Sequence, residues 1–225
     1  MKHLIGELSV VLVKLASGPD VDVRDIEQVR MILRDIYVTN RDDELRIAIL
    51  KAWATQPNTF HDEIAGALFD ESLQIRIKAI RACSPVVRFR HELNRLFVAG
   101  EPLTRETIVE MWGSDPNSFE KVLLEAEKDP HLAMQVVRIW GINPSEFNIH
   151  LKRLIGYTSI DVRLAVLAAW SFHPRYNSVE LRTAYETDND QRVRAAIFAI
   201  WQTDEEYFEQ DIERAKRLSK QNSTP

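Results

Sequence analysis

The sequence predicts an all-α fold, a solenoid of about six stacked two-helix repeats with capping helices at its ends. Two observations predict it: a block with helical apolar spacing recurs about every 30 residues, and a turn-forming block follows five of its copies in phase. A single pair of short helices cannot bury its apolar faces alone, so neighbouring pairs must stack. With 225 residues, 45% of them hydrophobic, the chain can bury a core of that kind.

The first block ends in tryptophan or, once, in cysteine. Its clearest copies are Asp43–Trp53, Asp161–Trp170 and Asp190–Trp201. Successive ends are spaced by 30, 29, 28, 30 and 31 residues, and they are Trp53, Cys83, Trp112, Trp140, Trp170 and Trp201. Apolar residues three and four positions apart give each copy one apolar helical face. We therefore expect the tryptophans to pack in the core and the cysteine to be buried and inert.

The second block predicts a turn and a second helix. WATQPNTF, WGSDPNSF and WGINPSEF begin at the tryptophans of three copies. A small residue follows the tryptophan, and a polar residue such as Asp115 or Asn143 can then cap a helix. The prolines Pro57, Pro116 and Pro144 fall where the first turn of that helix would be, a place where a missing N–H costs nothing. Each unit is therefore predicted to be two helices.

We expect these repeats to form one domain over residues 1–220. An N-terminal cap is predicted over about 1–40, the repeats over about 41–203 and a charged capping helix over about 204–220. Residues 221–225 are polar and are predicted to be a disordered tail.

Charge, apolar runs and cysteine content disfavour some classes of partner and compartment. The chain has 29 Lys and Arg against 34 Asp and Glu, whereas phosphate binding normally requires a basic excess, so nucleic acid is an unfavoured partner. No run approaches the roughly 20 apolar residues of a membrane span. The single cysteine permits no internal disulfide, which fits a reducing cytoplasm. We expect a cytoplasmic protein without a cofactor.

The first block resembles the short HEAT-like repeat of about 30 residues. The shared features are an acidic residue, then Val or Leu followed by Arg, and small and apolar residues at helical spacing, over about residues 40–220. The resemblance implies a right-handed α-solenoid like those of bilin lyases and related proteins. It implies no single function, because the same repeat occurs in bilin lyases, metal hydroxylases, proteins that recognise DNA lesions and plain adaptors.

A column of arginines recurs at one position of the first block: Arg46, Arg76, Arg105, Arg163 and Arg194. Such a column could bind a ligand, but in this type of repeat the arginine bonds an acidic residue or carbonyl of an adjacent turn. Aspartates near the helix starts are natural partners and caps. We interpret the column as framework.

The positions one and five residues after that arginine predict a groove. They should face outward, on the inner curve of the array. The groove residues are Ile47, Lys51, Ile77, Arg81, Met134, Arg138 and Leu164. An apolar floor with basic edges suits an amphipathic, somewhat acidic helix or tail of another protein. The alternative is that tight curvature packs these side chains against one another.

Three smaller features are weighed beside the groove. A basic patch of Arg76, Lys78, Arg88 and Arg90 could contact phosphate or an acidic partner, or be a chance cluster on a solvated face. Metal hydroxylases of this superfold repeat a His-Glu dipeptide, which occurs here only at His91, so we predict no metal site and interpret the histidines as lying on a solvated face. The turn after Trp170, with Phe172, is where we expect an exposed aromatic.

These observations favour a non-catalytic scaffold or adaptor that binds a protein segment on the concave face. No Gly-rich phosphate loop, nucleophile elbow or zinc-binding HExxH run occurs in the sequence, so we predict no enzyme active site. Two alternatives stay open. One is a nucleic-acid-binding solenoid that uses the basic patch, and the other is an enzyme subunit of the bilin-lyase kind, which requires a tetrapyrrole and a partner subunit.

Overall fold

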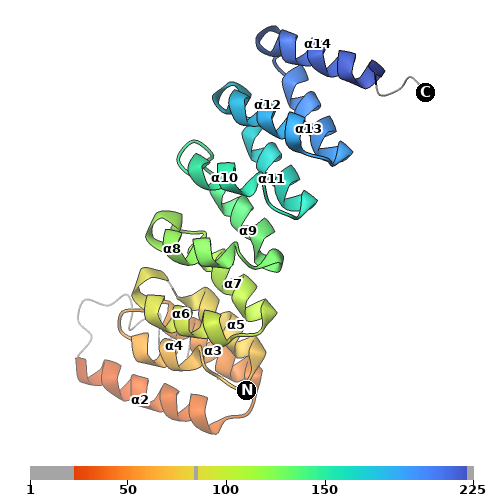
Figure 1. The fold of residues 1–225 in the computed structure, drawn as a ribbon. Helices are drawn as coiled ribbons and strands as arrows, with labels where there is room; N and C mark the ends of the chain where they lie inside the picture. Colours follow the sequence, from red (N-terminus) through yellow and green to blue (C-terminus); the bar gives the residue numbers. More distant parts are fainter. Residues whose placement is uncertain (1–22, 84–85, 222–225) are drawn as a thin grey trace. The chain divides into compact units, whose positions relative to one another are not determined.

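The computed structural model describes residues 23–83 and 86–221 (Figure 1). Over these ranges it contains thirteen α-helices, two short 3₁₀-helices and no strand, so the prediction of an all-α fold is confirmed. No helix in these ranges is both long enough and apolar enough to cross a membrane. Residues 1–22 of the predicted N-terminal cap and residues 222–225 of the predicted tail lie outside the described residues.

The helices alternate between the two sequence blocks. The first block forms α3 (Asp43–Ala54), α5 (Leu73–Ala82), α7 (Pro102–Trp112), α9 (Pro130–Trp140), α11 (Ile160–Trp170) and α13 (Gln191–Gln202). The second block leads into α4 (His61–Ala67), α6 (Arg90–Ala99), α8 (Pro116–Ala126), α10 (Asn148–Leu154), α12 (Ser178–Thr187) and α14 (Glu205–Gln221). The remaining elements are α2 (Val23–Thr39) and the 3₁₀-helices η1 (Val86–Phe89) and η2 (Pro174–Asn177).

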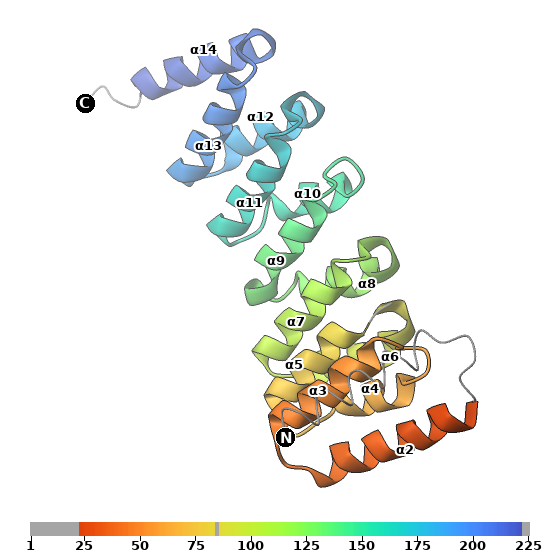
Figure 2. The ribbon, with the colours of Figure 1, turned by 180° about the vertical axis from the view of Figure 1, so that it is seen from behind.

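The chain divides into two compact units, Met1–Phe119 and Glu120–Pro225, with the boundary inside α8. In the first unit α5 packs against both α3 and α7, while α2 and α4 lie against α3. Figures 1 and 2 both show α3 and α5 side by side. In the second unit α11 packs against both α9 and α13, and α14 lies against α13. Within each unit, then, each first-block helix contacts the next one along the chain.

The tryptophans form the core of both units, as predicted. All five are at most 2% exposed: Trp53, Trp112, Trp140, Trp170 and Trp201. Four of them pair with the phenylalanine seven residues later, with ring centroids 4.8 to 6.4 Å apart. Three also contact an aromatic ring on the preceding helix at 4.8 to 4.9 Å: the pairs are Tyr37–Trp53, Phe97–Trp112 and Tyr185–Trp201. Burial of such large rings is a main source of stability.

Cys83 takes the tryptophan position directly after α5 and is fully buried, as predicted. Its Sγ donates a hydrogen bond to the Ala79 carbonyl at 3.2 Å. Burial raises the pKa of this thiol well above its ordinary value, so it stays protonated at neutral pH. A buried thiol is a poor nucleophile.

The buried phenylalanine of the second block sets where the second helix begins. Phe60 and Phe147 have φ of −107° and −97° with ψ of 28° and 19°, outside the helical region, and α4 and α10 start immediately after them. The prediction that Pro57 and Pro144 lie in the first turn of these helices is therefore wrong, because the chain is still turning at the prolines. Phe208 has the same backbone shape, φ −102° and ψ 16°, and it kinks α14.

The helix start was predicted correctly for α8. Pro116 is its first residue, and the Asp115 carboxylate accepts a hydrogen bond from the Ser118 N–H at 3.3 Å. The charged capping helix predicted at about 204–220 corresponds to α14.

Candidate functional site

Three arginines of the column link one first-block helix to the start of the next. The ion pairs are Arg46–Asp70, Arg76–Glu101 and Arg163–Asp188, the last with 2.7 Å between Nε and Oδ2. Arg76 and Arg163 also each donate to two backbone carbonyls of the intervening turn, at 2.7 and 3.1 Å. These contacts are the ones that the framework interpretation predicts.

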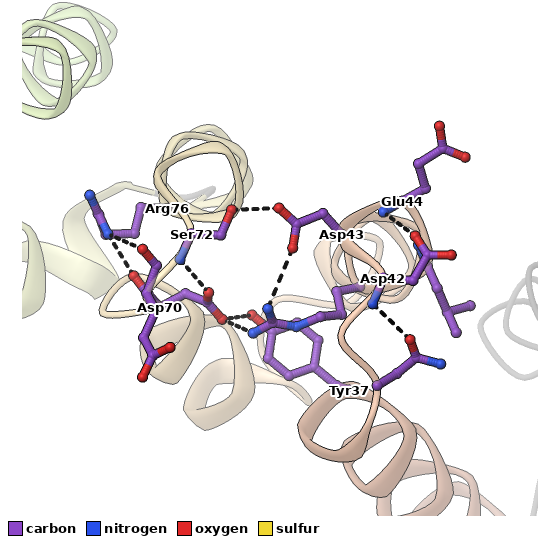
Figure 3. A network of polar contacts seen from close by, with 11 residues as sticks. Tyr37, Asp42, Asp43, Glu44, Asp70, Ser72 and Arg76 are labelled. Atoms are coloured by element: carbon purple, nitrogen blue, oxygen red, sulfur yellow. Dashed lines mark hydrogen bonds and ion pairs between the residues drawn. The ribbon is translucent and has the colours of Figure 1, made fainter.

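Asp70 is the centre of the polar network drawn in Figure 3. Its Oδ2 accepts hydrogen bonds from Arg46 and, at 2.8 Å, from the Tyr37 hydroxyl, while its Oδ1 accepts the Ser72 N–H at 2.9 Å. The Ser72 hydroxyl in turn donates to Asp43 Oδ2 at 2.6 Å. Burial raises the pKa of Tyr37, and so does its bond to Asp70, so the phenol remains a donor. The network fastens α2, α3 and α5 together.

A second set of polar contacts joins successive second-block helices, and sequence reasoning missed it. In four copies the residue ten positions after the tryptophan pairs with a side chain on the preceding second-block helix or, for Glu63, on α2. The pairs are Arg30–Glu63, His150–Glu120, Lys152–Glu180 and Arg182–Asp211, with N···O distances of 2.6, 3.0, 2.5 and 2.9 Å. Of the four residues at this position, three are carboxylates and one is a histidine. Because each pairs with a neighbouring helix, we interpret this column of residues as framework too.

In the first unit the predicted groove residues lie on α3 and α5. Ile47 is buried at 9% exposed, and Ile77 is half-buried. The burial of Ile47 matches the alternative in which these side chains pack against one another. Lys51 and Arg81 are exposed, but Arg81 Nη2 lies 3.7 Å from a Glu110 carboxylate oxygen on α7, which reduces the positive charge at this edge.

In the second unit the predicted groove residues come together around one pocket. Met134 and Leu164 are half-buried and Arg138 is exposed, and all three line an open pocket of about 550 Å³ between α9 and α11. The rest of its lining is mostly small: Val137, Gly141, Asp161, Ala165, Ala168, Ala169 and Phe172. We call this the α9–α11 pocket.

A second pocket of about 550 Å³ adjoins it, and the two share Ala169 and Phe172. The Phe172 side chain is 75% exposed and Tyr176 is 65% exposed. Prolines 144 and 174 line the same pocket, which we call the corner pocket. The exposed aromatic predicted after Trp170 is therefore present, and a second one stands beside it.

The local sequence holds this corner firmly. The Trp170 Nε1–H donates to Asn148 Oδ1 at 3.0 Å, which anchors the end of α11 to α10. After Phe172 the chain enters η2, and Arg175 donates to the Asp204 carboxylate at 2.5 and 2.9 Å. That bond holds the pKa of Asp204 below its ordinary value. Phe172 is thus displayed on a turn that is fastened on both sides.

Close approach between the helix ends depends on Gly141. A Cβ at Gly141 would lie 3.2 Å from the Ala169 Cβ and 3.1 Å from the Val137 carbonyl oxygen, tighter than ordinary contacts. The C-terminal ends of α9 and α11 therefore meet, and the two adjacent helices run in the same direction.

The four residues of the predicted basic patch do not form one site. Arg76 is paired with Glu101, and Arg90 donates to the Ser118 carbonyl at 2.6 Å and lies 5.0 Å from the centre of the Phe119 ring. Lys78 and Arg88 are exposed, on α5 and η1. Two of the four guanidinium and ammonium groups are therefore already held by protein groups.

The histidines occupy different environments. No group of three or more His, Cys, Asp or Glu side chains is arranged to hold a metal ion within residues 23–83 and 86–221. His61 stacks on Phe89 with ring centroids 4.7 Å apart. His150 is buried, with its ring centroid 4.6 Å from that of Trp140, so its predicted place on a solvated face is wrong. Burial lowers the pKa of His150, and the Glu120 carboxylate opposes that shift.

A third pocket, of about 870 Å³, lies along α10 and α12. Its charged side chains already have partners: Lys152 pairs with Glu180, and Arg153 lies 2.5 Å from Glu127. Burial raises the pKa of Glu127, while Arg153 opposes the shift. With its charges neutralised in pairs, this pocket has less to offer a ligand than the exposed aromatic corner.

Tyr176 is the main feature of the site that sequence reasoning missed. It occupies the position that Thr59, Ser118 and Glu146 take in three other turns and that Tyr207 takes in the last one, and Asn177 takes the place of the buried phenylalanine. The signal was therefore in the sequence, as a tyrosine next to the loss of that phenylalanine in one copy.

No protein-family model matches this chain, and neither does any curated protein or solved structure.

Proposed function

We propose that this chain is a cytoplasmic, non-catalytic scaffold, a right-handed solenoid of about six HEAT-like two-helix repeats that binds a segment of another protein on its concave face. The observation that carries the proposal is the corner of the second unit, where Phe172 and Tyr176 are 75% and 65% exposed beside two pockets. A clustered, exposed apolar surface on a soluble protein is typical of an interaction site.

Support for the repeat architecture comes from contacts that recur at equivalent positions. The tryptophan-to-phenylalanine pairing occurs in both units, and so does the bond from the column arginine to the acid that precedes the next helix. Within each unit, contacts of this kind join one helix pair to the next, which is what a stacked array requires.

Support for a protein segment as the ligand comes from the chemistry of the pocket walls. Met134, Leu164 and Phe172 present apolar surface, and Arg138 and Asp161 are exposed charges at its edges. Large flexible or aromatic side chains around a shallow, open pocket suit the side chains of a helix or tail. In contrast, Arg76 and Arg90 of the basic patch already bond protein groups, which does not favour a phosphate site there.

Affinity purification from the native host, read by mass spectrometry, tests the proposal. We expect the double variant Phe172→Glu with Tyr176→Glu to lose the proteins that wild type retains, and Met134→Glu to lose them as well. Ile149→Glu is the matched control, since Ile149 is 73% exposed on α10 and lines neither pocket. Circular dichroism on each variant checks folding. Full retention by the folded corner variant would refute a binding role for this surface.

The two alternative functions have different readouts. A nucleic-acid-binding protein would bind duplex DNA with a steep dependence on salt concentration. A bilin-lyase-type subunit would acquire colour when mixed with a bilin and its partner subunit. Either result, combined with unchanged behaviour of the corner variant, would replace the scaffold proposal.

A further inference from the structure

The α9–α11 pocket carries opposite charges at its two ends. Arg138 lies in the last turn of α9 and Asp161 in the first turn of α11, and both line the pocket. Both side chains are exposed, and neither forms an ion pair with another described residue. They are therefore available to charges on a ligand.

The offset of the two charges along the helix axes follows from the contact between the helix ends. Gly141, three residues after Arg138, lies against Ala169, so Arg138 lies about level with Val166 of the parallel helix α11. Val166 is five residues after Asp161, which is about 7.5 Å, or between one and two helical turns, along the axis. One end of the pocket is thus negative and the other positive.

Between the charges the pocket is apolar, with a shallow floor. Ala165 and Ala168 form part of the floor, and Met134 and Leu164 are the larger side chains beside them. Small residues between two parallel helices leave a groove into which the ridge of a third helix fits. An amphipathic helix is the occupant that this surface suits.

We infer that the α9–α11 pocket binds an amphipathic helix of a partner protein that carries an acidic side chain opposite Arg138 and a basic one opposite Asp161. The two charges stand about one to two turns apart on the partner helix, and aliphatic residues lie between them. This inference rests on the proposed function and adds the charge pattern of the partner. Opposite charges across an interface select the register, and like charges reject wrong partners.

Three synthetic helical peptides with the same leucine stripe test the charge pattern. One has an acidic and a basic end, one has two acidic ends, and one has two basic ends; fluorescence anisotropy measures their affinity for the full chain. We expect the mixed peptide to bind about fivefold more tightly than either of the others, the effect of about 1 kcal/mol for one exposed charge contact. High salt should reduce the difference.

Single charge reversals sharpen the test. Arg138→Glu makes both ends of the pocket acidic, so the preference should move to the peptide with two basic ends. Asp161→Lys should move it to the peptide with two acidic ends. Glu209→Lys, at an exposed position of α14, is the matched control and should leave the order unchanged.

The outcomes separate this inference from the function on which it rests. Equal affinities for the three peptides, no binding of any, or an order that the reversals do not change would overturn the charge pattern. If the native partner is still lost from the Phe172→Glu, Tyr176→Glu variant in that case, the scaffold proposal stands without it. If that folded variant keeps the native partner, the scaffold proposal fails whatever the peptides do.

Discussion

The two units use the same pair of helices in different ways. In Met1–Phe119 the Arg46–Asp70 ion pair is extended by Tyr37 and Ser72, so that polar contacts tie α2, α3 and α5 together. In Glu120–Pro225 the equivalent pair, Arg163–Asp188, has no tyrosine, and the turn after α11 exposes Phe172 instead.

The difference teaches where a repeated helix pair can vary. Positions that join one pair to the next, the tryptophan and the column arginine, repeat between the units because stacking requires them. In the turn after Trp170, the side chains of Phe172 and Tyr176 are exposed and do not join one pair to the next. A copy that departs from the pattern there is free to acquire a binding surface, as function resides in sites added to a fold.

The largest expected effect contrasts a buried aromatic with an exposed one in the second unit. Trp140→Ala removes a fully buried ring and should lower the free energy of unfolding by about 3 to 5 kcal/mol. Phe172→Ala should change it by less than about 0.5 kcal/mol, because the ring is already exposed. Urea denaturation followed by far-UV circular dichroism measures both. A large loss of stability in Phe172→Ala would show that the corner is structural.

Replacing the aspartate of the arginine–aspartate pair that links successive first-block helices compares the stability of this link in the two units. Asp70→Ala leaves Arg46, Tyr37 and the Ser72 N–H without their acceptor and should destabilise the protein by about 3 kcal/mol. Asp188→Ala leaves Arg163 and the Asp190 N–H without theirs, but no tyrosine, and should cost about 2 kcal/mol in the same denaturation assay.

The tyrosine is responsible for that difference. Tyr37→Phe alone should therefore cost about 1 kcal/mol, the usual size of one hydrogen bond. Equal costs for the two aspartates, together with a silent Tyr37→Phe, would contradict the idea that the first unit is more tightly linked at this position.

Much of the framework was predictable because its signals are local. The spacing of apolar residues located the helices of the first block, and the equivalence of the tryptophans predicted their burial. The bonds of Arg46, Arg76 and Arg163 followed from aspartates and carbonyls near the helix starts.

The failures arose where neighbouring helices decide the outcome. Burial of Ile47 and His150 depends on how closely adjacent helices approach, which helical periodicity does not report. α4 and α10 begin later than predicted because of the backbone conformation of Phe60 and Phe147, which their buried rings fix. The proline three residues before each phenylalanine suggested an earlier start. For the site, sequence supplied Met134, Arg138, Leu164 and Phe172, but not the pockets that they share.

Two glycines test how tightly the helices of each unit approach. Gly66, in α4 of the first unit, has no heavy atom within 4 Å of a built Cβ, so Gly66→Ala should stabilise the protein by about 0.5 to 1 kcal/mol through helix propensity. Gly141→Ala, in the second unit, should destabilise it by about 1 kcal/mol, since α9 and α11 must separate slightly. Thermal unfolding of both variants measures the two signs. A stabilising Gly141→Ala would mean that this approach is looser than 3.2 Å.

The smallest expected effect concerns the ion-pair column between second-block helices. The first unit has the pair Arg30–Glu63, which contains no histidine, whereas the second unit has His150–Glu120 at the equivalent place. Burial lowers the pKa of His150 below its ordinary value of 6.5, so between that value and the folded pKa the unfolded chain binds more protons. Stability from this residue is present above pH 6.5 and is lost as pH falls through the folded pKa.

Denaturation midpoints at pH 7.5 and 5.5 measure the loss, and His150→Gln should remove that part of the pH dependence. Glu120→Gln should make it larger, because the Glu120 carboxylate opposes the lowering of the pKa of His150. The two variants therefore move the pH dependence in opposite directions, which a general loosening of the second unit would not do. A pH dependence that is the same in wild type and His150→Gln would show that burial of this imidazole carries no proton linkage.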